Sequence, residues 1–268
     1  MDNRPIGIFD SGLGGLTCVK KVMELLPNED IIYFGDTGRV PYGSRSSDTI
    51  VKYTRQDIRF LESFDIKYII IACGTASSAA LPWIQQEFAT EICGVLKPAC
   101  RAAVAATQNK KIGVIGTQGT VRSGKYYDTL KELDPSVAVI SKACPLFVPL
   151  VENGHTSGQL AYLAAEEYLT ELKAAGVDTL ILGCTHYPLL TDTIRQVMGE
   201  QVTLIDAGAE TAAYAKLRLE EQGILAGERT GSASYYVSDE VEGFTDIAQM
   251  FLEKKLEGRV KKIEIETY

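Results

Sequence analysis

The stretch that decides the fold is YIIIACGTASS, residues 68–78, and it has a partial echo in TLILGCTHYP, residues 179–188. Each is a short apolar run that reaches a cysteine, followed by a hydroxyl-rich turn and a helical pattern. Such runs are typical of buried parallel strands that lead into helices. We therefore predict that Cys73 and Cys184 lie at strand carboxyl ends, where open α/β sheets bind ligands, and beside helix N-termini, which favour anions.

The pattern around these two segments occurs twice along the chain. The run PIGIFD at residues 5–10 resembles KIGVIG at residues 111–116, and each is followed by a glycine-containing turn. Ile6 and Cys73 are 67 positions apart, and Ile112 and Cys184 are 72 positions apart. Such similar intervals predict an internal duplication. We expect an α/β protein with two similar Rossmann-like lobes, mainly parallel sheets, a pseudo-twofold relation, and a shared cleft between the lobes.

The remaining elements follow from apolar periodicity and from helix stop signals such as the proline at position 27. We predict strands at residues 5–10, 31–35, 68–73, 92–96, 111–116, 137–141, 179–183, 202–206 and 234–237. We predict helices at residues 16–26, 48–64, 77–89, 98–107, 160–175, 211–222 and 243–256.

Composition excludes several classes of function. The formal net charge is −8, and no basic run is present, which argues against nucleic acid or an anionic membrane as partner. No apolar stretch approaches the roughly 20 residues that span a bilayer, and no secretory signal pattern opens the sequence. Six cysteines without regular spacing or a CxxC motif do not resemble a disulfide framework. We expect reduced thiols and a cytoplasmic location.

The glycines of DSGLGG, residues 10–15, do not form a nucleotide-binding motif. Thr17 stands where the last glycine of G-x-G-x-x-G belongs, and no GK[ST] follows. The loop could present N–H groups to a carboxylate, or it could simply be a tight turn between a strand and a helix. The spacing does not decide between these two interpretations.

Cysteine position separates two thiols from the other four. We interpret Cys18, Cys93, Cys100 and Cys144 as small apolar core residues. Cys73 and Cys184, by contrast, precede helix starts, where a thiol pKa can fall from its ordinary value near 8.5 into the neutral range, so that the thiol exchanges protons there.

Titratable residues near these thiols are candidate helpers. Asp10 ends the first predicted strand and could assist Cys73, while His186 could assist Cys184. Glu152 and Asp36 follow apolar runs, but a solvated loop carboxylate is the simpler interpretation of each. Zinc binding is a competing hypothesis, although Cys-x-His is tighter than usual zinc spacing. A Cys–His hydrolase is another, and it leaves the second cysteine without a role.

Six motifs together resemble the cofactor-independent aspartate/glutamate racemase family, in the order in which the family carries them. They are DSGLGG, GDTGRVPYG, ACGTAS, IGVIGT, VPLVENG and LGCTHYP, and they extend from the first predicted strand to residue 188. The resemblance implies two α/β lobes, with residues 207–268 returning to residues 1–97 in the first lobe and residues 98–206 forming the second. It implies interconversion of L- and D-glutamate for bacterial peptidoglycan, without cofactor or metal. The implied partner is glutamate, and a homodimer is allowed.

The same resemblance implies roles for individual residues. Cys73 and Cys184 would be the two acid/base groups, one on each face of the substrate. Asp10 and His186 would assist them, with Glu152 and Asp36 in supporting positions. The substrate-binding positions that the resemblance implies are Asp10, Ser11, Tyr42, Gly43, Gly74, Thr75, Thr117, Thr185 and His186.

Position 74 departs from the family pattern, in which asparagine follows the first cysteine. Because that amide helps to hold the substrate, the sequence predicts that Gly74→Asn raises kcat/KM. Two other functions stay open on the sequence. An aspartate or other amino-acid racemase would use the same chemistry, whereas decarboxylases of the superfamily keep only one of the two cysteines. A non-catalytic two-lobed binding protein would use the cleft without chemistry.

Overall fold

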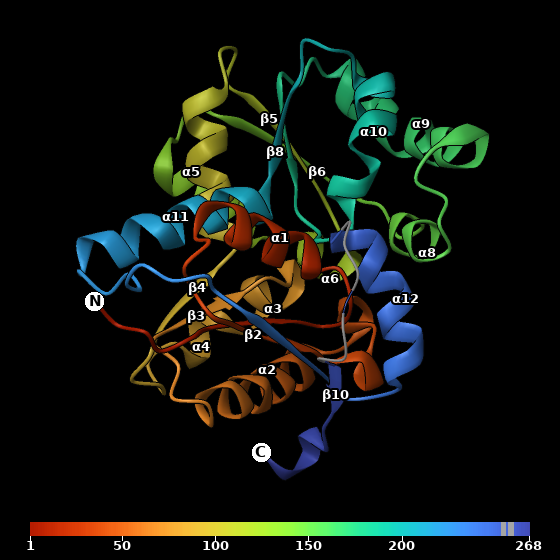
Figure 1. Ribbon diagram of the computed structural model, residues 1–268. Helices are drawn as coiled ribbons and strands as arrows, with labels where there is room; N and C mark the ends of the chain where they lie inside the picture. Colours follow the sequence, from red (N-terminus) through yellow and green to blue (C-terminus); the bar gives the residue numbers. More distant parts are fainter. Residues whose placement is uncertain (253–255, 257–259) are drawn as a thin grey trace.

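The computed structural model describes residues 1–252, 256 and 260–268, and it contains two parallel sheets in separate lobes (Figure 1). The six-stranded sheet has the order β10-β9-β2-β1-β3-β4 and the four-stranded sheet the order β6-β5-β7-β8. The first contains β1 (Ile6–Asp10), β2 (Ile31–Gly35), β3 (Tyr68–Ile71), β4 (Glu91–Gly94), β9 (Ala233–Val237) and β10 (Val260–Lys262). The second contains β5 (Lys111–Gly116), β6 (Ala138–Ala143), β7 (Thr179–Leu182) and β8 (Thr203–Asp206). The predicted α/β class with mainly parallel sheets in two lobes is confirmed.

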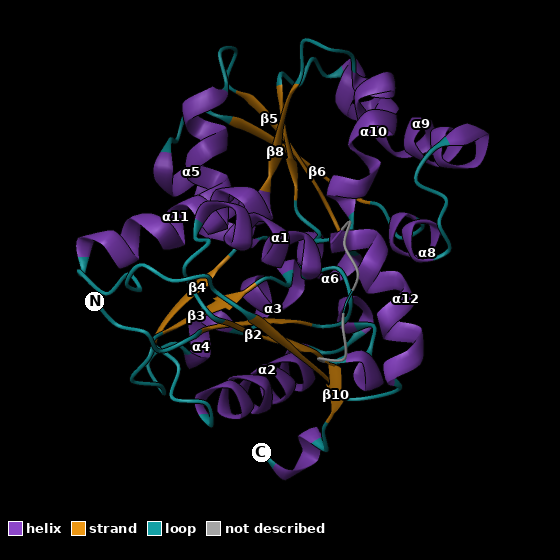
Figure 2. Cartoon of the chain, in the orientation of Figure 1, coloured by secondary structure: helices purple, strands orange, loops and turns teal. Residues whose placement is uncertain are grey.

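Helices surround both sheets (Figure 2). In chain order they are α1 (Leu16–Leu25), α2 (Ser47–Glu62), α3 (Gly74–Ala79), α4 (Leu81–Ile84), α5 (Leu96–Ala106), α6 (Gln118–Arg122), α7 (Lys125–Leu133), α8 (Phe147–Glu152), α9 (Gly158–Ala174), α10 (Thr191–Met198), α11 (Ala207–Glu221) and α12 (Val241–Leu252). Among these described segments, no helix is both long enough and apolar enough to cross a membrane.

The central strands β1, β3 and β7 are buried along their whole length because both faces of each sheet are covered there. Alternate residues of β3 belong to different core clusters: Ile70 shares one with Val19 of α1, whereas Ile69 and Ile71 share another with Ile58 of α2. All four residues of β3 are buried. This two-sided burial places the end of the strand, and the cysteine that follows it, in the interior between the lobes.

Strand order supports the internal duplication. The run β2-β1-β3-β4 of the first sheet has the same order as β6-β5-β7-β8 of the second, and every one of these pairs is parallel. Cys73 stands two residues after β3, and Cys184 stands two residues after β7. The two thiols therefore occupy corresponding strand ends. The pseudo-twofold relation itself stays a prediction.

The lobes meet where the chain passes between the sheets. Helix α11 packs against α1 and against α5, and in Figure 1 α1 and α11 lie between the two sheets, with α5 beside the four-stranded sheet. The predicted boundaries, after residues 97 and 206, fall near the β4–α5 and β8–α11 connections. The division of the chain at these residues stays a prediction.

Two predicted helices differ from the structure. The helix predicted at residues 77–89 is α3 followed by α4, because Pro82 has no N–H to continue the first helix and is accepted in the first turn of a new one. The helix predicted at residues 243–256 corresponds to α12, and its last part, residues 253–255, lies outside the described residues. The sequence did not predict α6, α7, α8, α10 or β10.

Candidate active site between the lobes

A cavity of about 280 Å³ lies between the lobes at the carboxyl ends of the central strands. Both predicted catalytic cysteines line it, one from each lobe. The other predicted site residues that line it are Ser11, Tyr42, Gly43, Gly74, Thr75, Thr117, Glu152, Thr185 and His186. Of the predicted set, Asp10 and Asp36 do not line it. The sequence missed the apolar part of the wall, formed by Val40, Pro41, Val148 and Pro149, two pairs that stand inside motifs already quoted.

Cys73 is a buried thiol at the start of α3. Its Sγ accepts a hydrogen bond from the Ala76 N–H at 3.4 Å and donates to Ser11 Oγ at 3.3 Å. Burial, together with the charge of Asp10, raises the pKa of Cys73 to about 12. The helix N-terminus does not overcome this desolvation. Cys73 is therefore a neutral thiol at neutral pH, a state suited to donating a proton.

Cys184 lies beside a histidine that is held by a carboxylate. His186 Nδ1 is 3.9 Å from Cys184 Sγ, and His186 Nε2 is 3.0 Å from Glu152 Oε1 at the end of α8. Burial alone would lower the pKa of His186, but its bonds to Cys184 and Glu152 outweigh burial and raise that pKa to about 10. His186 is therefore an imidazolium at neutral pH, and its positive charge lies beside the Cys184 side chain.

Asp10 lies behind the cavity wall and joins the lobes. One of its oxygens accepts from the Gly12 N–H at 3.0 Å, and the other faces the Thr185 hydroxyl of the opposite lobe at 3.4 Å. The carboxyl is buried, which raises its pKa. Its charge acts on Cys73, but the hydrogen bond of that thiol goes to Ser11. Direct assistance to Cys73 by Asp10 stays a prediction.

The DSGLGG loop is a close contact between lobes as well as a tight turn. A Cβ atom at Gly14 would lie 2.2 Å from Thr185 Oγ1 and 2.5 Å from His186 Nδ1. Thr17 stands in the first turn of α1, directly after this loop, and its hydroxyl donates to the carbonyl oxygen of Thr185 at 2.9 Å. The loop thus fixes the position of the Cys184 turn, and Gly14 is required by this approach.

Similarity to known proteins agrees with this geometry. The profile of the Asp/Glu/hydantoin racemase family matches residues 15–215 of the chain. The chain belongs to this family. A glutamate racemase from Geobacter metallireducens is 46% identical over 269 residues, which cover 98% of this chain and 97% of that protein. The predicted family and the predicted class of enzyme, an isomerase, are confirmed.

Solved structures of relatives have the same fold. The glutamate racemase from Bacillus anthracis has a TM-score of 0.95 and 37% identity, with 98% of each chain covered. The glutamate racemase from Francisella tularensis, solved in complex with D-glutamate, has a TM-score of 0.93 and 37% identity, with 100% of each chain covered. The two-lobed architecture of this racemase is therefore that of its relatives.

Asp36 of this racemase is fully buried outside the cavity. Its carboxylate accepts from Arg39 Nε at 2.7 Å, from Ser238 Oγ at 2.8 Å, and from the Tyr42 hydroxyl. It does not reach a reacting atom through any of these bonds. A role for Asp36 has to be exerted through Tyr42, whose loop does line the cavity.

Gly74 is enclosed by the opposite lobe. A Cβ atom built at this position would lie 2.3 Å from the carbonyl oxygen of Gly183, which is main chain and cannot rotate away. The structure therefore reverses the expectation that Gly74→Asn raises kcat/KM. Any side chain here has to push the Cys73 turn and the Cys184 turn apart.

We expect Glu152→Gln to move the basic limb of the kcat/KM profile to lower pH. Glu152 helps to raise the pKa of His186 to about 10, so loss of its charge lowers that pKa. The same ionisation also affects the free energy of unfolding. In the native protein, the contribution of charged His186 to that free energy is fully present below pH 6.5 and is lost as the pH rises through about 10. In the variant this loss begins at lower pH. An NMR titration of His186 and rate profiles for both enantiomers measure the shift.

Glu171→Gln is the matched control, because Glu171 forms an exposed ion pair with Lys142 at 2.9 Å, away from the cavity. Its profile should overlay that of the native protein. A Glu152→Gln profile that also overlays it would contradict the assigned role of the carboxylate.

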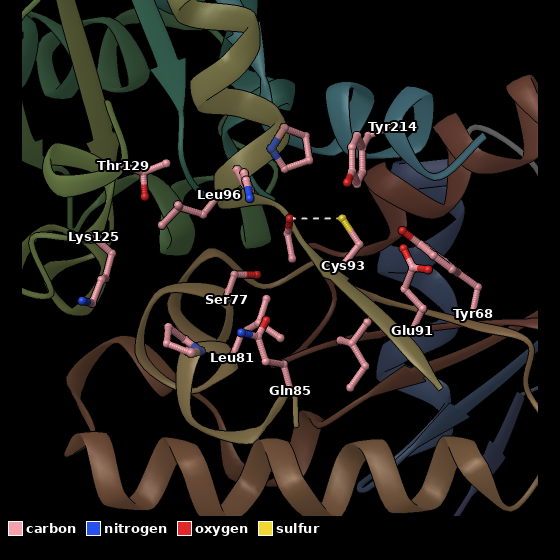
Figure 3. A pocket seen from close by; sticks show the side chains of 15 residues that line it. Tyr68, Ser77, Leu81, Gln85, Glu91, Cys93, Leu96, Lys125, Thr129 and Tyr214 are labelled. Atoms are coloured by element: carbon pink, nitrogen blue, oxygen red, sulfur yellow. Dashed lines mark hydrogen bonds between the residues drawn. The ribbon is translucent and has the colours of Figure 1, made fainter. Parts of the chain in front are cut away.

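A second cavity, of about 390 Å³, lies near the β4–α5 connection and contains another cysteine (Figure 3). The Cys93 thiol donates to the carbonyl of Gly94 at 3.5 Å, and burial raises its pKa to about 12. The described lining of this cavity offers neither a histidine nor a second thiol. Within the described residues, no group of three or more His, Cys, Asp or Glu side chains is arranged to hold a metal. The paired-thiol chemistry belongs to the smaller cavity.

Proposed function

We propose that this protein is a glutamate racemase that works by proton transfer between two cysteines and the substrate Cα. The observation that carries the proposal is the convergence of Cys73 and Cys184, from corresponding strand ends of two lobes, on one cavity. A single base would require the carbanion to turn over within the site. Thiols on opposite walls remove that requirement, since one accepts the α-proton while the other donates to the opposite face.

The two settings assign the starting roles. Cys184, beside the His186 imidazolium, removes the α-proton as a thiolate, and the neutral Cys73 thiol delivers its own proton to the other face. The product leaves Cys184 protonated and Cys73 as thiolate, which is the starting state for the reverse reaction. Acid–base positioning contributes about 10²–10⁴-fold to the rate. Oriented N–H groups that stabilise the carbanion in a cavity shielded from water supply the remainder.

The cavity wall favours a small dicarboxylic amino acid. Its described lining contains hydroxyls and helix starts but neither lysine nor arginine, so substrate carboxylates would be bound by N–H and O–H donors. Thr75 and Thr117, from opposite lobes, lie 2.9 Å apart through their hydroxyls and are suited to bridging one carboxylate. Glu152 supplies the carboxylate of the wall and suits the substrate ammonium group.

Relatives named glutamate racemase, one of them solved with D-glutamate, support glutamate as the substrate. The bacterial sources of these relatives support supply of D-glutamate for peptidoglycan in the cytoplasm. A homodimer and the absence of nucleic-acid and membrane partners stay predictions.

Incubation with L-glutamate in D₂O tests the proposal. We expect deuterium at Cα together with loss of optical rotation, and a lower kcat/KM for L-aspartate under the same conditions. Binding of glutamate without deuterium incorporation would indicate a non-catalytic binding protein. Faster turnover of aspartate would assign the chain to another racemase of the same family.

A further inference from the structure

A buried cluster of four polar side chains stands behind one wall of the cavity. Asp36, which directly follows β2, and Asp57, which belongs to α2, are both fully buried. Arg39 lies between their carboxyl groups. Arg39 Nε donates to Asp36 Oδ2 at 2.7 Å, and Arg39 Nη2 donates to Asp57 Oδ1 at 2.8 Å. Tyr42 Oη lies within bonding distance of Asp36 Oδ2 and 2.9 Å from Asp57 Oδ2. The cluster thus contains two carboxyl groups, one guanidinium and one phenol.

Counting protons shows that these contacts cannot all be made by two carboxylates. The phenol has a single hydrogen, yet its oxygen faces a carboxyl oxygen of each aspartate. Both oxygens of Asp36 already have donors, namely Arg39 and Ser238, so this residue is satisfied as an anion. Ser238 in turn accepts from the Gly38 N–H at 2.8 Å, which leaves its hydroxyl hydrogen for Asp36.

Asp57 differs from Asp36 at one oxygen. Its Oδ1 receives Arg39, but the sole hydrogen-bond partner recorded for its Oδ2 among the described residues is Tyr42 Oη. When the Tyr42 hydrogen points to Asp36, two lone-pair atoms face each other unless Asp57 carries a proton. With a proton on Asp57 Oδ2, every contact of the cluster has one donor and one acceptor. The cluster is then neutral, because the Asp36 anion offsets the Arg39 cation.

We propose that Asp57 is a protonated carboxylic acid that donates to Tyr42, and that it positions the loop of residues 40–43, which forms one wall of the cavity. Val40, Pro41, Tyr42 and Gly43 of this loop all line the cavity. Asp57 itself does not line it, so it is a positioning residue that acts through Tyr42. This assignment rests on the proposed function only where KM for glutamate is measured below.

The electrostatic surroundings support this protonation state. Burial and the charge of Asp36 raise the pKa of Asp57 well above its ordinary value, against the opposing effects of Arg39 and Tyr42. Asp10 is the other charged group that acts on Asp57, and it raises the same pKa. Burial also raises the pKa of Tyr42, so the phenol keeps its hydrogen.

The position of the loop affects both lobes. A Cβ atom at Gly43 would lie 2.9 Å from Thr117 Cβ, and one at Gly119 would lie 2.8 Å from the carbonyl oxygen of Gly43. The loop therefore rests against the start of α6 in the second lobe. Movement of Tyr42 displaces a part of the wall that contacts substrate, while the two thiols keep their places. A change at Asp57 should consequently raise KM more than it lowers kcat.

Two substitutions at position 57 separate the protonated state from the ionised one. In Asp57→Asn the amide can donate to Tyr42 Oη and its oxygen can accept from Arg39, so the variant reproduces a neutral carboxylic acid. We expect its melting temperature and its KM for glutamate to stay close to the native values. Asp57→Leu removes both bonds, and we expect KM to rise roughly 10-fold with a loss of several degrees in melting temperature. Asp48→Asn, an exposed change on the same helix, is the matched control.

Infrared difference spectra of native protein minus Asp57→Asn test the proton directly. We expect the band of a protonated carboxylic acid at neutral pH. A carboxylate band instead, or an Asp57→Asn variant as impaired as Asp57→Leu, would overturn the proposal. Spectra and melting temperatures need no turnover, so they decide the state of Asp57 even if glutamate proves not to be the substrate.

Discussion

Cys73→Ala and Cys184→Ala should each lower racemisation of glutamate by at least about 10²–10⁴-fold, the usual contribution of one positioned acid or base. Each variant removes the proton donor or acceptor from one wall of the cavity and leaves the other in place. The remaining thiol can still exchange the α-proton of the enantiomer that faces it. We therefore expect that each variant incorporates deuterium from D₂O into one enantiomer without inversion, and that the two variants select opposite enantiomers.

Cys100→Ala provides the control, because Cys100 is fully buried in the second lobe and does not line the cavity. It should lose some thermal stability and keep its racemase activity. The two-base mechanism fails if one of the two active-site variants still racemises glutamate at a rate near that of the native protein. It also fails if both variants exchange the same enantiomer.

Gly74→Asn should lower kcat/KM for glutamate by at least about 10-fold and should destabilise the protein by about 1–3 kcal/mol, the usual range for overpacking. The physical reason is the 2.3 Å separation between a Cβ at this position and the Gly183 carbonyl oxygen. Relief of that contact moves the start of α3 away from the Cys184 turn. Because both thiols sit beside this contact, the distance that the α-proton has to travel increases. Steady-state kinetics and thermal melting measure the two effects.

Gly74→Ala separates crowding from the chemistry of the amide. Alanine adds the same Cβ atom without a polar group, so it should show the steric loss alone. An asparagine variant more active than the alanine variant would mean that the amide contacts the substrate. A kcat/KM above that of the native protein for Gly74→Asn would refute the steric argument and restore the expectation drawn from the family motif.

The strands could be predicted from the sequence because their signals are local. The ranges of β2 and β5 agree residue for residue with the predicted strands, since each is an apolar run between turn residues. The missed elements depend on distant contacts instead. β10 has three residues, two of them exposed lysines, and it exists because it pairs with β9. Helices α6 and α8 have five and six residues, too few for an apolar period to repeat.

The site was predictable in part for the same reason. Their positions at strand ends predicted that Cys73 and Cys184 lie close together, and both line one cavity. The same signal could not show which way a neighbouring carboxylate points. Asp36 turns inward to Arg39, and the enclosure of Gly74 comes from a main chain far along the sequence. Asp57 did give a usable signal: its carboxyl lies at helical spacing with the buried residues Ile50 and Leu61. A charged residue on an otherwise apolar helix face indicates a partner in the interior.

The contacts across the lobes at Gly14, Gly43 and Gly74 also bear on how far this protein can be re-engineered. At these points a glycine of one lobe faces the Gly183 carbonyl, the Thr117 side chain, or the Thr185 and His186 side chains of the other lobe, so the glycine half of each contact has no side chain to be exchanged for a smaller one. Libraries that vary only the chamber lining would therefore keep its width. Acceptance of a bulkier amino acid would require insertions in the connections between the lobes, which can respace both halves together.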